Sequence, residues 1–321
     1  MKNVIILTEE EKELFIELSK PLIDISPSKE IDLYLSLAKY ASSKIPIRIK
    51  KILYEFRRKG TENGMLLFKN IPFDKNIKTP DNNSFHIGEN TILSRIQAII
   101  NEYIGEMVGY ESEGYGRLFQ DMVPNKNLSN SQTSLGSNVE LELHTEQAFS
   151  ELRPDFLSLA CLKGDSSAKT YYFHIDQIVR QMTNEEIDYL KKERWMIGVD
   201  ESFVMNGCSS NLRGPLSIFT EKNENYQLVF DQDLMIGNTD EATILLNKII
   251  DLYYLYRKEV ILNSGEILLL DNKKVVHGRS VFSPKFDGND RFIIRSFVIK
   301  HLDKILNKTS KNKRMISSKF S

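Results

Sequence analysis

The sequence is poor in cysteine: its 321 residues include only two, Cys161 and Cys208. Two cysteines can form at most one disulfide bond, which is too few for the disulfide frameworks that are characteristic of small exported proteins. Cys161 lies in the apolar run FLSLACL, where we expect a buried, unreactive thiol rather than a nucleophile. The cysteines therefore argue against export and against thiol chemistry.

Long apolar runs are also missing from the sequence. The longest, such as EILLL at residues 266–270, are far shorter than the roughly 20 residues that cross a bilayer. The acidic beginning MKNVIILTEEEKE lacks the apolar segment and the small-residue cleavage site of an export signal. We therefore expect a cytoplasmic protein with no membrane partner.

Neither sign of charge is in excess, because 43 Lys and Arg residues are balanced by 44 Asp and Glu residues, for a net charge of -1. Such a chain has no general field that would attract nucleic acid or an anionic surface. The balance argues against nucleic acid as a partner and favours a small molecule.

Two kinds of apolar periodicity are present. Spacings of three and four residues predict helices near residues 9–20, 29–42, 47–59, 92–110, 183–194 and 239–257. After Gly116, short apolar stretches separated by turn residues predict strands, among them VELELH, DFLSLACL, KVVHG and RFIIRSFVI. Together they predict the α+β class, with sheet packed on sheet in a jelly roll or barrel and with N-terminal and flanking helices.

No repeat or low-complexity linker divides the chain, so we expect residues 1–321 to form a single domain. Residues 1–64 are predicted to be its helical N-terminal part. Residues 65–299 would form the jelly-roll core with inserted helices, and residues 300–321 a basic, mobile tail.

The segment LELHTEQ, residues 141–147, places a histidine and a glutamate two positions apart in a strand-like pattern. In an extended strand His144 and Glu146 lie on one face. His277 ends another predicted strand, KVVH, and Gly278 follows where the chain must turn. If both strands open at one mouth of a barrel, two imidazoles and a carboxylate can face a metal with three positions left free, a set that suits Fe(II).

Two other interpretations of these residues stay open. Two histidines and a glutamate with an open position also describe hydrolytic zinc sites. His144 could instead be a core histidine, with Glu146 as its hydrogen-bond partner.

Two arginines in RFIIRSFV, Arg291 and Arg295, are four residues apart on a predicted strand and therefore share one face. An arginine that points into a barrel is costly unless an anion pairs with it, and its planar guanidinium suits a carboxylate. Two such arginines require two anions, and neither anion needs to come from the protein.

Three segments of the chain resemble a known family. HTEQAFSELRPDFLSLACL, GEILLLDNKKVVHGRSVF and RFIIRSFV are similar to the signature segments of the clavaminate synthase-like oxygenases, which depend on Fe(II) and 2-oxoglutarate. That family includes asparagine and arginine β-hydroxylases and free-lysine hydroxylases. The similarity extends from GMLLFKNIP to RSFVI, roughly three quarters of the chain. It implies a double-stranded β-helix, in agreement with the predicted jelly roll.

The resemblance implies roles for the residues that match the family's motifs. His144, Glu146 and His277 would bind the iron. Arg291 would bind the distal carboxylate of 2-oxoglutarate, and Thr170, at the start of TYYF, would assist in holding a carboxylate of this co-substrate.

The resemblance also implies a substrate site. Arg295 would bind the α-carboxylate of an amino acid, Glu146 would also meet its ammonium, and Gln120 in LFQDMVP would contact the substrate backbone. Asp231 and Asp233 in VFDQDLM are predicted to share a strand face, where acidic residues of arginine-specific members contact a guanidinium. Paired acids there favour a basic substrate, L-lysine or L-arginine.

The activity implied is that of a dioxygenase that uses Fe(II), 2-oxoglutarate and O2 to hydroxylate an unactivated side-chain carbon of a free L-amino acid, with release of succinate and CO2. Related halogenases have a small residue in place of the metal carboxylate, so Glu146 favours hydroxylation over chlorination. The alternatives are a carrier-bound or peptidyl substrate, desaturation, and, in a different class, a non-catalytic cupin-like metal-binding protein. Residues 201–215, rich in Gly, Ser and Asn, are predicted to form a mobile lid.

Overall fold

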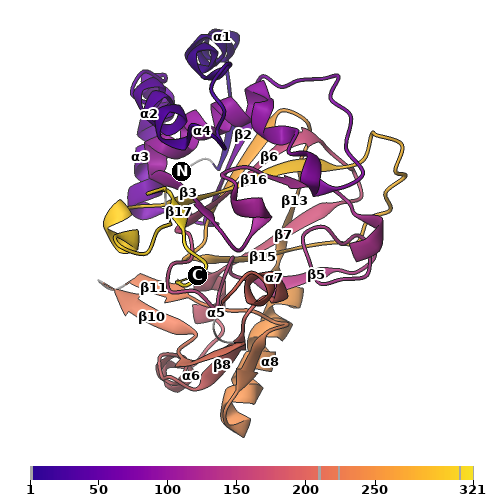
Figure 1. Ribbon diagram of the computed structural model, residues 1–321. Coiled ribbons are helices and arrows are strands. Elements are labelled where there is room, and N and C mark those ends of the chain that lie inside the picture. Colours follow the sequence, from indigo (N-terminus) through magenta and orange to yellow (C-terminus); the bar gives the residue numbers. More distant parts are fainter. Residues whose placement is uncertain (1–2, 209–210, 223–224, 311, 321) are drawn as a thin grey trace.

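The computed structural model describes residues 3–208, 211–222, 225–310 and 312–320. Two sheets stacked face to face form its centre, and the N-terminal helices cover the outer face of the larger sheet (Figure 1). The predicted α+β class with a double-stranded β-helix core is confirmed.

The larger sheet has the strand order β1-β2-β14-β6-β16-β3-β17, and β4 also pairs with β16. Its described pairs are antiparallel except β1 with β2 and β3 with β17. The strands are β1 (Val4–Ile6), β2 (Met65–Lys69), β3 (Glu106–Tyr110), β4 (Gln120–Met122), β6 (Phe156–Lys163), β14 (Glu266–Asp271), β16 (Phe292–Ile299) and β17 (Met315–Ile316).

The smaller sheet has the order β13-β7-β15-β5, and all its described pairs are antiparallel. Its strands are β5 (Leu141–His144), β7 (Lys169–His174), β13 (Lys258–Ile261) and β15 (Val275–Arg279). Two smaller units complete the β-structure: a three-stranded sheet of β8 (Trp195–Gly198), β9 (Leu212–Leu216) and β12 (Met235–Gly237), and the pair β10 (Phe219–Lys222) and β11 (Asn225–Leu228).

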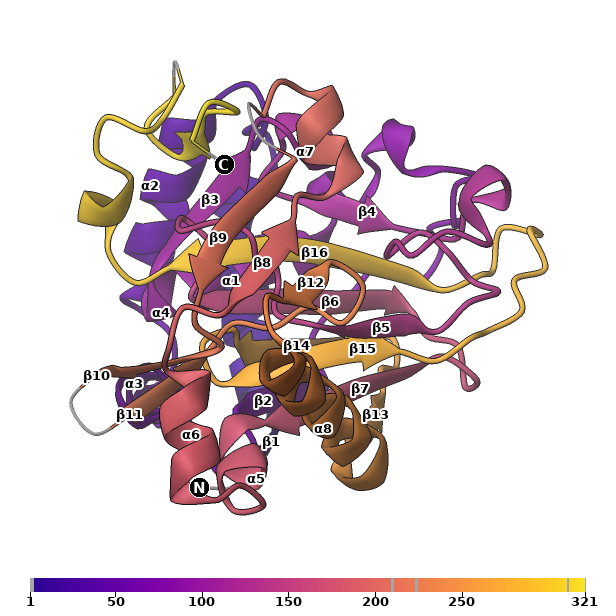
Figure 2. The same cartoon turned by 90° about the horizontal axis from the view of Figure 1, so that it is seen from below.

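The helices form two groups. The N-terminal group is α1 (Glu9–Ser19), α2 (Ile31–Ser42), α3 (Ile47–Lys59) and α4 (Ile92–Ile104), and α1 begins with a capping box formed by Thr8 and Glu11. The second group is α5 (Ile175–Val179), α6 (Asn184–Leu190), α7 (Glu201–Met205) and α8 (Asp240–Tyr256). Figure 2 shows α5, α6 and α8 together on the underside of the molecule.

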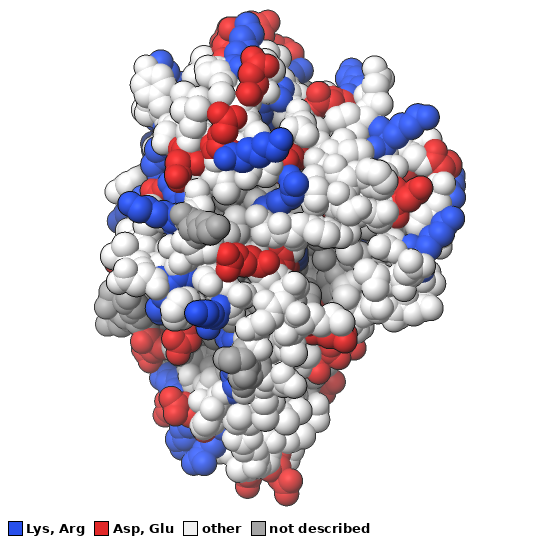
Figure 3. Space-filling model, viewed as in Figure 1, with Lys and Arg blue, Asp and Glu red and all other residues white. Residues whose placement is uncertain are grey.

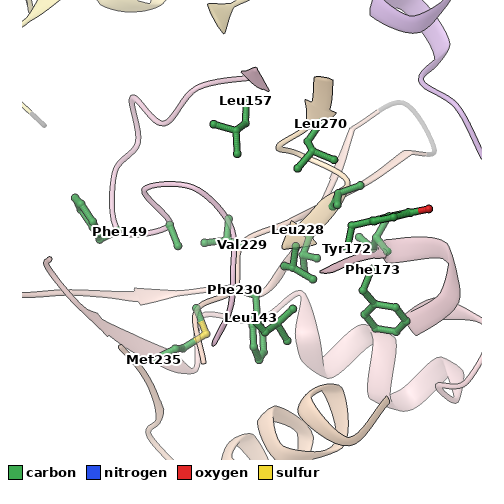
Figure 4. Close-up of a cluster of buried hydrophobic side chains, with 14 of the residues drawn as sticks. Leu143, Phe149, Leu157, Tyr172, Phe173, Leu228, Val229, Phe230, Met235 and Leu270 are labelled. Atoms are coloured by element: carbon green, nitrogen blue, oxygen red, sulfur yellow. The ribbon is translucent and has the colours of Figure 1, made fainter. Parts of the chain in front are cut away.

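Alternation along the strands of the larger sheet builds two hydrophobic cores. On β14, Ile267 and Leu269 pack against the N-terminal helices, whereas Leu268 and Leu270 pack toward the smaller sheet. Figure 4 shows the inner core, with labelled side chains Leu143, Phe149, Leu157, Tyr172, Phe173, Leu228, Val229, Phe230, Met235 and Leu270. On β16 the odd-numbered residues face this inner core, so the parity of the strand turns Arg295 inward, and Arg291 immediately precedes the strand.

The helix predicted at residues 92–110 is shorter than expected. α4 ends at Ile104, and the chain continues directly as β3. A Cβ atom on Gly105 would lie 2.3 Å from the backbone oxygen of Ile299, so only glycine lets the helix end come this close to β16. The apolar spacing continues past this point because β3 is buried as well, which is why periodicity alone did not locate the boundary.

The tail predicted to be mobile, residues 300–321, is folded onto the core in its described part, which excludes positions 311 and 321. Lys304 donates to the buried Asp155 carboxylate at 2.8 Å, and β17 pairs with β3. Arg314 donates to Glu102 at 3.2 Å. The basic residues of the tail therefore neutralise buried acids of the core, a pairing that the local sequence could not indicate.

The predicted lid, residues 201–215, is partly regular structure. It begins as α7 and ends in β9, which pairs with β8 in the three-stranded sheet. Residues 209–210 lie outside the described residues.

The surface matches the balanced composition. Basic and acidic side chains are intermixed over the face shown in Figure 3. No helix in the described part of the chain has the length and apolar character needed to cross a membrane.

Candidate active site

The structure brings His144, Glu146 and His277 together at one end of the smaller sheet. His144 and His277 are directly opposite each other on the paired strands β5 and β15, and their ring centroids are 4.3 Å apart. Glu146 lies in the turn that follows β5, with its Oε2 3.6 Å from Nε2 of His277. One ligand atom from each residue lies within 4.8 Å of the others, a spacing at which a single metal ion can contact all three.

The protonation states of this cluster suit a metal. Nδ1 of His144 lies 2.7 Å from the backbone oxygen of Glu142 and donates to it, which leaves the Nε2 lone pair free to bind. Burial, reinforced by His277, lowers the pKa of His144. Burial opposes the charge of Glu146, but Arg295 and His277 outweigh it and lower the pKa of this carboxyl to about 2. The cluster therefore offers neutral imidazole and ionised carboxylate at neutral pH.

Arg291 immediately precedes β16, and its guanidinium lies 6.0 Å from the ring of Phe282. It is buried, and no carboxylate of the described residues forms an ion pair with it. Burial lowers the pKa of Arg291 and also, to about 9 with help from Arg291, that of the neighbouring Arg279. The hydroxyl of Thr170, opposite Arg279 across the β7–β15 pair, is buried and has no hydrogen-bond partner. Two buried guanidiniums and an unsatisfied hydroxyl form a site for an anionic ligand.

Arg295 occupies the other end of this inner face and is fully surrounded by acceptors. Its Nε donates to Oε1 of Gln120 at 3.0 Å, and its Nη1 donates to Oε1 of Glu146 at 3.0 Å. Its Nη2 donates to Gln120 and to Glu113. The three residues that were predicted to contact the substrate, Arg295, Glu146 and Gln120, therefore lie together, and their contacts with a substrate stay predictions.

Glu113 is a site residue that the sequence interpretation missed. It is held by Arg295 and by Nε2 of Gln147 at 2.7 Å. Burial raises the pKa of Glu113 to about 7 in spite of the guanidinium. The neighbouring Gly114 has a φ of 55°, and a Cβ there would lie 2.3 Å from the Gln120 side chain, so glycine lets Gln120 pack against this turn.

The predicted arrangement of Asp231 and Asp233 is wrong in part. β11 ends at Leu228, and Asp231 begins a turn in which its Oδ1 accepts from the backbone N–H groups of Asp233 at 3.0 Å and Leu234 at 2.9 Å. Asp231 forms an isolated bridge with His144 and is half-buried, whereas Asp233 is exposed. Burial raises the pKa of Asp231 to about 6, against the influence of His144. The two acids do not share a strand face, and only Asp231 lies beside the histidine cluster.

The fold and the cluster together define a class. A double-stranded β-helix with a His, Glu and His cluster and a buried, unpaired arginine between its sheets has the construction of a 2-oxoglutarate-dependent non-haem iron oxygenase.

Comparison with known proteins identifies the family. No family model matches the chain. An L-lysine 3-hydroxylase from Catenulispora acidiphila is 45% identical over 292 residues, which are 90% of this chain and 82% of the relative. Clavaminate synthase 2 from Streptomyces clavuligerus is 24% identical over 284 residues, 85% of each chain. The structure of asparagine oxygenase in complex with Fe(II), 2S,3S-3-hydroxyasparagine and succinate has a TM-score of 0.89 at 23% identity, and covers 98% of this chain and 99% of its own.

The chain belongs to the clavaminate synthase-like family of Fe(II)- and 2-oxoglutarate-dependent amino-acid oxygenases. The predicted enzyme class is confirmed, with Fe(II) as its cofactor and 2-oxoglutarate and O2 as its co-substrates.

Proposed function

We propose that this enzyme hydroxylates an unactivated side-chain carbon of free L-lysine, with all of residues 1–321 acting as one oxygenase domain. The observation that carries the proposal is the order of charged groups along the inner face. Arg291 immediately precedes β16 and Arg295 lies on it four residues later, about 13 Å away at 3.3 Å per residue, and the His144, Glu146 and His277 cluster lies near Arg295. This order of charges suits a dicarboxylate at one end and an amino acid at the other.

The position of the 2-oxoglutarate site is inferred from the buried guanidinium of Arg291, which forms no ion pair with a carboxylate of the described residues. His144, Glu146 and His277 would bind Fe(II), whose function is to activate O2 for the oxidative decarboxylation of 2-oxoglutarate. Arg291 would bind the distal carboxylate of 2-oxoglutarate, which supplies the missing counter-charge, and the unsatisfied Thr170 hydroxyl would donate to the same ligand.

The substrate end combines one cation with two acids. Arg295 would bind the α-carboxylate of lysine through the Nη2 atom that now contacts Glu113 and Gln120. When Glu113 is ionised, Glu113 and Glu146 together carry one more charge than Arg295 neutralises, and an α-ammonium group would favour this ionised form. A free amino acid carries both charges, whereas a peptidyl residue carries neither, so this pairing favours a free substrate.

The side-chain end rests on Asp231. Its half-buried carboxyl lies beside His144 and has no cationic side chain of the described residues bonded to it, so the ε-ammonium of lysine would provide a charge-assisted partner. The 45% identical relative named L-lysine 3-hydroxylase supports lysine over arginine. Asp233 is exposed and contributes less than the paired-acid prediction required.

The test is succinate release from 2-oxoglutarate with Fe(II), ascorbate and air, measured against each free proteinogenic L-amino acid and ornithine, with mass spectrometry for added oxygen. We expect lysine to stimulate turnover and to gain one oxygen atom. Nα-acetyl-lysine and Nε-acetyl-lysine are the matched controls, because each removes one ammonium charge.

Three results would contradict the proposal. Loss of two hydrogens without added oxygen would indicate desaturation. Stimulation by Nα-acetyl-lysine but not by lysine would indicate a tethered substrate. Failure to bind 2-oxoglutarate would leave a metal-binding protein without this activity.

A further inference from the structure

Glu146 lies at a point where strand pairing has ended. β5 stops at His144, and the backbone N–H of Thr145 donates to Phe230. The backbone groups of Glu146 are therefore held by a side chain. Its N–H donates to Oδ1 of Asn272 at 2.8 Å, and its carbonyl oxygen accepts from Nδ2 of Asn272 at 3.1 Å. One primary amide thus replaces the two hydrogen bonds that a neighbouring strand would make.

Asn272 is itself tightly anchored. It is 1% exposed, its Nδ2 also donates to the carbonyl oxygen of Pro154 at 2.9 Å, and its backbone N–H donates to Asp155 at 3.0 Å. Both amide hydrogens and the amide oxygen are therefore used, and the amide orientation is set by its partners. The turn also has a support that does not involve Asn272: Oδ1 of the adjacent Asp271 accepts a hydrogen bond from the backbone N–H of Lys273 at 3.1 Å.

The same turn leads into the strand that carries His277. Asn272 is in the connection between β14 and β15, and His277 follows on β15. The turn therefore links two members of the cluster: it holds Glu146 through a side chain and His277 through the covalent chain. Arg295 holds one carboxylate oxygen of Glu146 from the opposite sheet. The backbone clamp and the ion pair together leave Oε2 directed at His277.

We propose that Asn272 is a positioning residue for metal binding, which sets the backbone of Glu146 so that its carboxylate meets the two histidines. This inference rests on the proposed function, since it assumes that the three residues bind a metal. Partners of this kind, which orient a ligand without touching the metal, change metal affinity by about 10- to 100-fold when they are removed.

The experiment is an anaerobic titration of the metal-free protein with Co(II), which forms visible d–d bands when it binds. Asn272→Ala removes the whole clamp, whereas Asn272→Asp keeps an acceptor for the Glu146 N–H and loses both donations. Asp271→Asn is the matched control, because it changes the same turn without contact to Glu146. We expect Co(II) affinity about 10- to 100-fold weaker in Asn272→Ala, an intermediate loss in Asn272→Asp, and wild-type affinity in Asp271→Asn.

Two further measurements separate positioning from stability. The melting temperature of each metal-free variant reports folding, and the visible charge-transfer absorption of Fe(II) with 2-oxoglutarate reports the geometry at the metal. Wild-type Co(II) affinity in folded Asn272→Ala would overturn the inference, and loss of the fold in both Asn272 variants would make the residue structural and overturn it too. If the wild-type protein itself bound no Co(II), the proposed function would fail, which is a different outcome from failure of the clamp.

Discussion

At the scale of the residue, strand parity made much of the site predictable. His144 on β5 and Arg295 on β16 lie at the site as the alternation predicts, whereas Glu146 and Arg291 lie just beyond the ends of these strands. Glu113 and Asn272 were not predicted, because both act from turns. A turn has no repeating pattern of apolar residues from which the direction of a side chain could be predicted, and the partners of Glu113 and Asn272 come from distant segments of the chain.

Replacement of His277 should weaken metal binding without affecting the stability of the fold. We expect His277→Ala to abolish succinate production and to weaken Co(II) binding strongly, because one of three ligands is removed. The melting temperature of the metal-free protein should change little, since the side chain lines a site rather than packing a core. The neighbouring Val276, on the opposite face of β15, provides a control: Val276→Ala should lower the melting temperature and leave Co(II) affinity intact. Unchanged succinate production in purified His277→Ala would remove this histidine from the metal site.

Asp231 and Asp233 provide a matched pair for substrate selection. Asp231→Asn should raise the KM for lysine about 10- to 150-fold, the equivalent of roughly 1.5–3 kcal/mol for a lost charge-assisted hydrogen bond. Asp233→Asn should have a much smaller effect because its carboxylate is exposed. Steady-state kinetics at saturating 2-oxoglutarate would check both variants. Equal increases in KM for the two variants, or an equal increase for a neutral amino acid, would argue against a cationic subsite at Asp231.

At the scale of the element, apolar spacing predicted the existence of most helices and strands but not how α4 ends or what the last residues do. The boundary of α4 depends on the contact between Gly105 and Ile299, which are far apart in sequence. The tail depends on acids that are buried elsewhere, Asp155 and Glu102. Both features depend on contacts between residues that are far apart in sequence, so they cannot be predicted from a short segment of the sequence.

The contact between the tail and α4 makes stability depend on pH. Burial raises the pKa of Glu102 to about 7, although Arg314 and the backbone N–H of Met107 favour its charged form. The folded protein therefore holds this proton more tightly than the unfolded chain does, with an ordinary pKa of 4.5. Glu102 should thus make the protein less stable as the pH rises through the interval from about 4.5 to about 7.

Denaturant unfolding across this pH interval tests the effect. The free energy of unfolding of Glu102→Gln should improve relative to wild type as the pH rises, because the variant has no carboxyl to ionise. Glu106→Gln is the control: Glu106 also pairs with Arg314 but is only half-buried. A constant difference between Glu102→Gln and wild type at every pH would contradict the assignment.

At the scale of the whole molecule, the site joins the two sheets. His144 and His277 belong to the smaller sheet, Arg295 belongs to the larger one, and Arg291 immediately precedes the strand that carries Arg295. A bound 2-oxoglutarate that contacts both the metal and Arg291 would connect the sheets across the inner core. Ligand binding should therefore be measurable as stability of the whole fold.

In the presence of metal, 2-oxoglutarate at 100 times its Kd should raise the free energy of unfolding by about 2.7 kcal/mol. Arg291→Met should lose this gain at the same concentration, and without 2-oxoglutarate it should be at least as stable as wild type, because a buried charge without a counter-ion has been removed. Thermal unfolding would measure both effects. 2-Oxobutyrate, which lacks the distal carboxylate, is the control ligand. A full shift with 2-oxobutyrate, or in Arg291→Met, would place the carboxylate contact elsewhere.

The position of β16 has a consequence for biosynthesis. This strand lies between β6 and β3 in the middle of the larger sheet, yet its residues, 292–299, follow both of these strands far along the sequence. The two flanking strands are therefore synthesised well before β16, and the edges that it will cover stay unpaired until it is made. A nascent chain that has not reached this strand lacks Arg295 and the shared partner of β6 and β3, so it depends on protection of these two edges from aggregation until β16 is made.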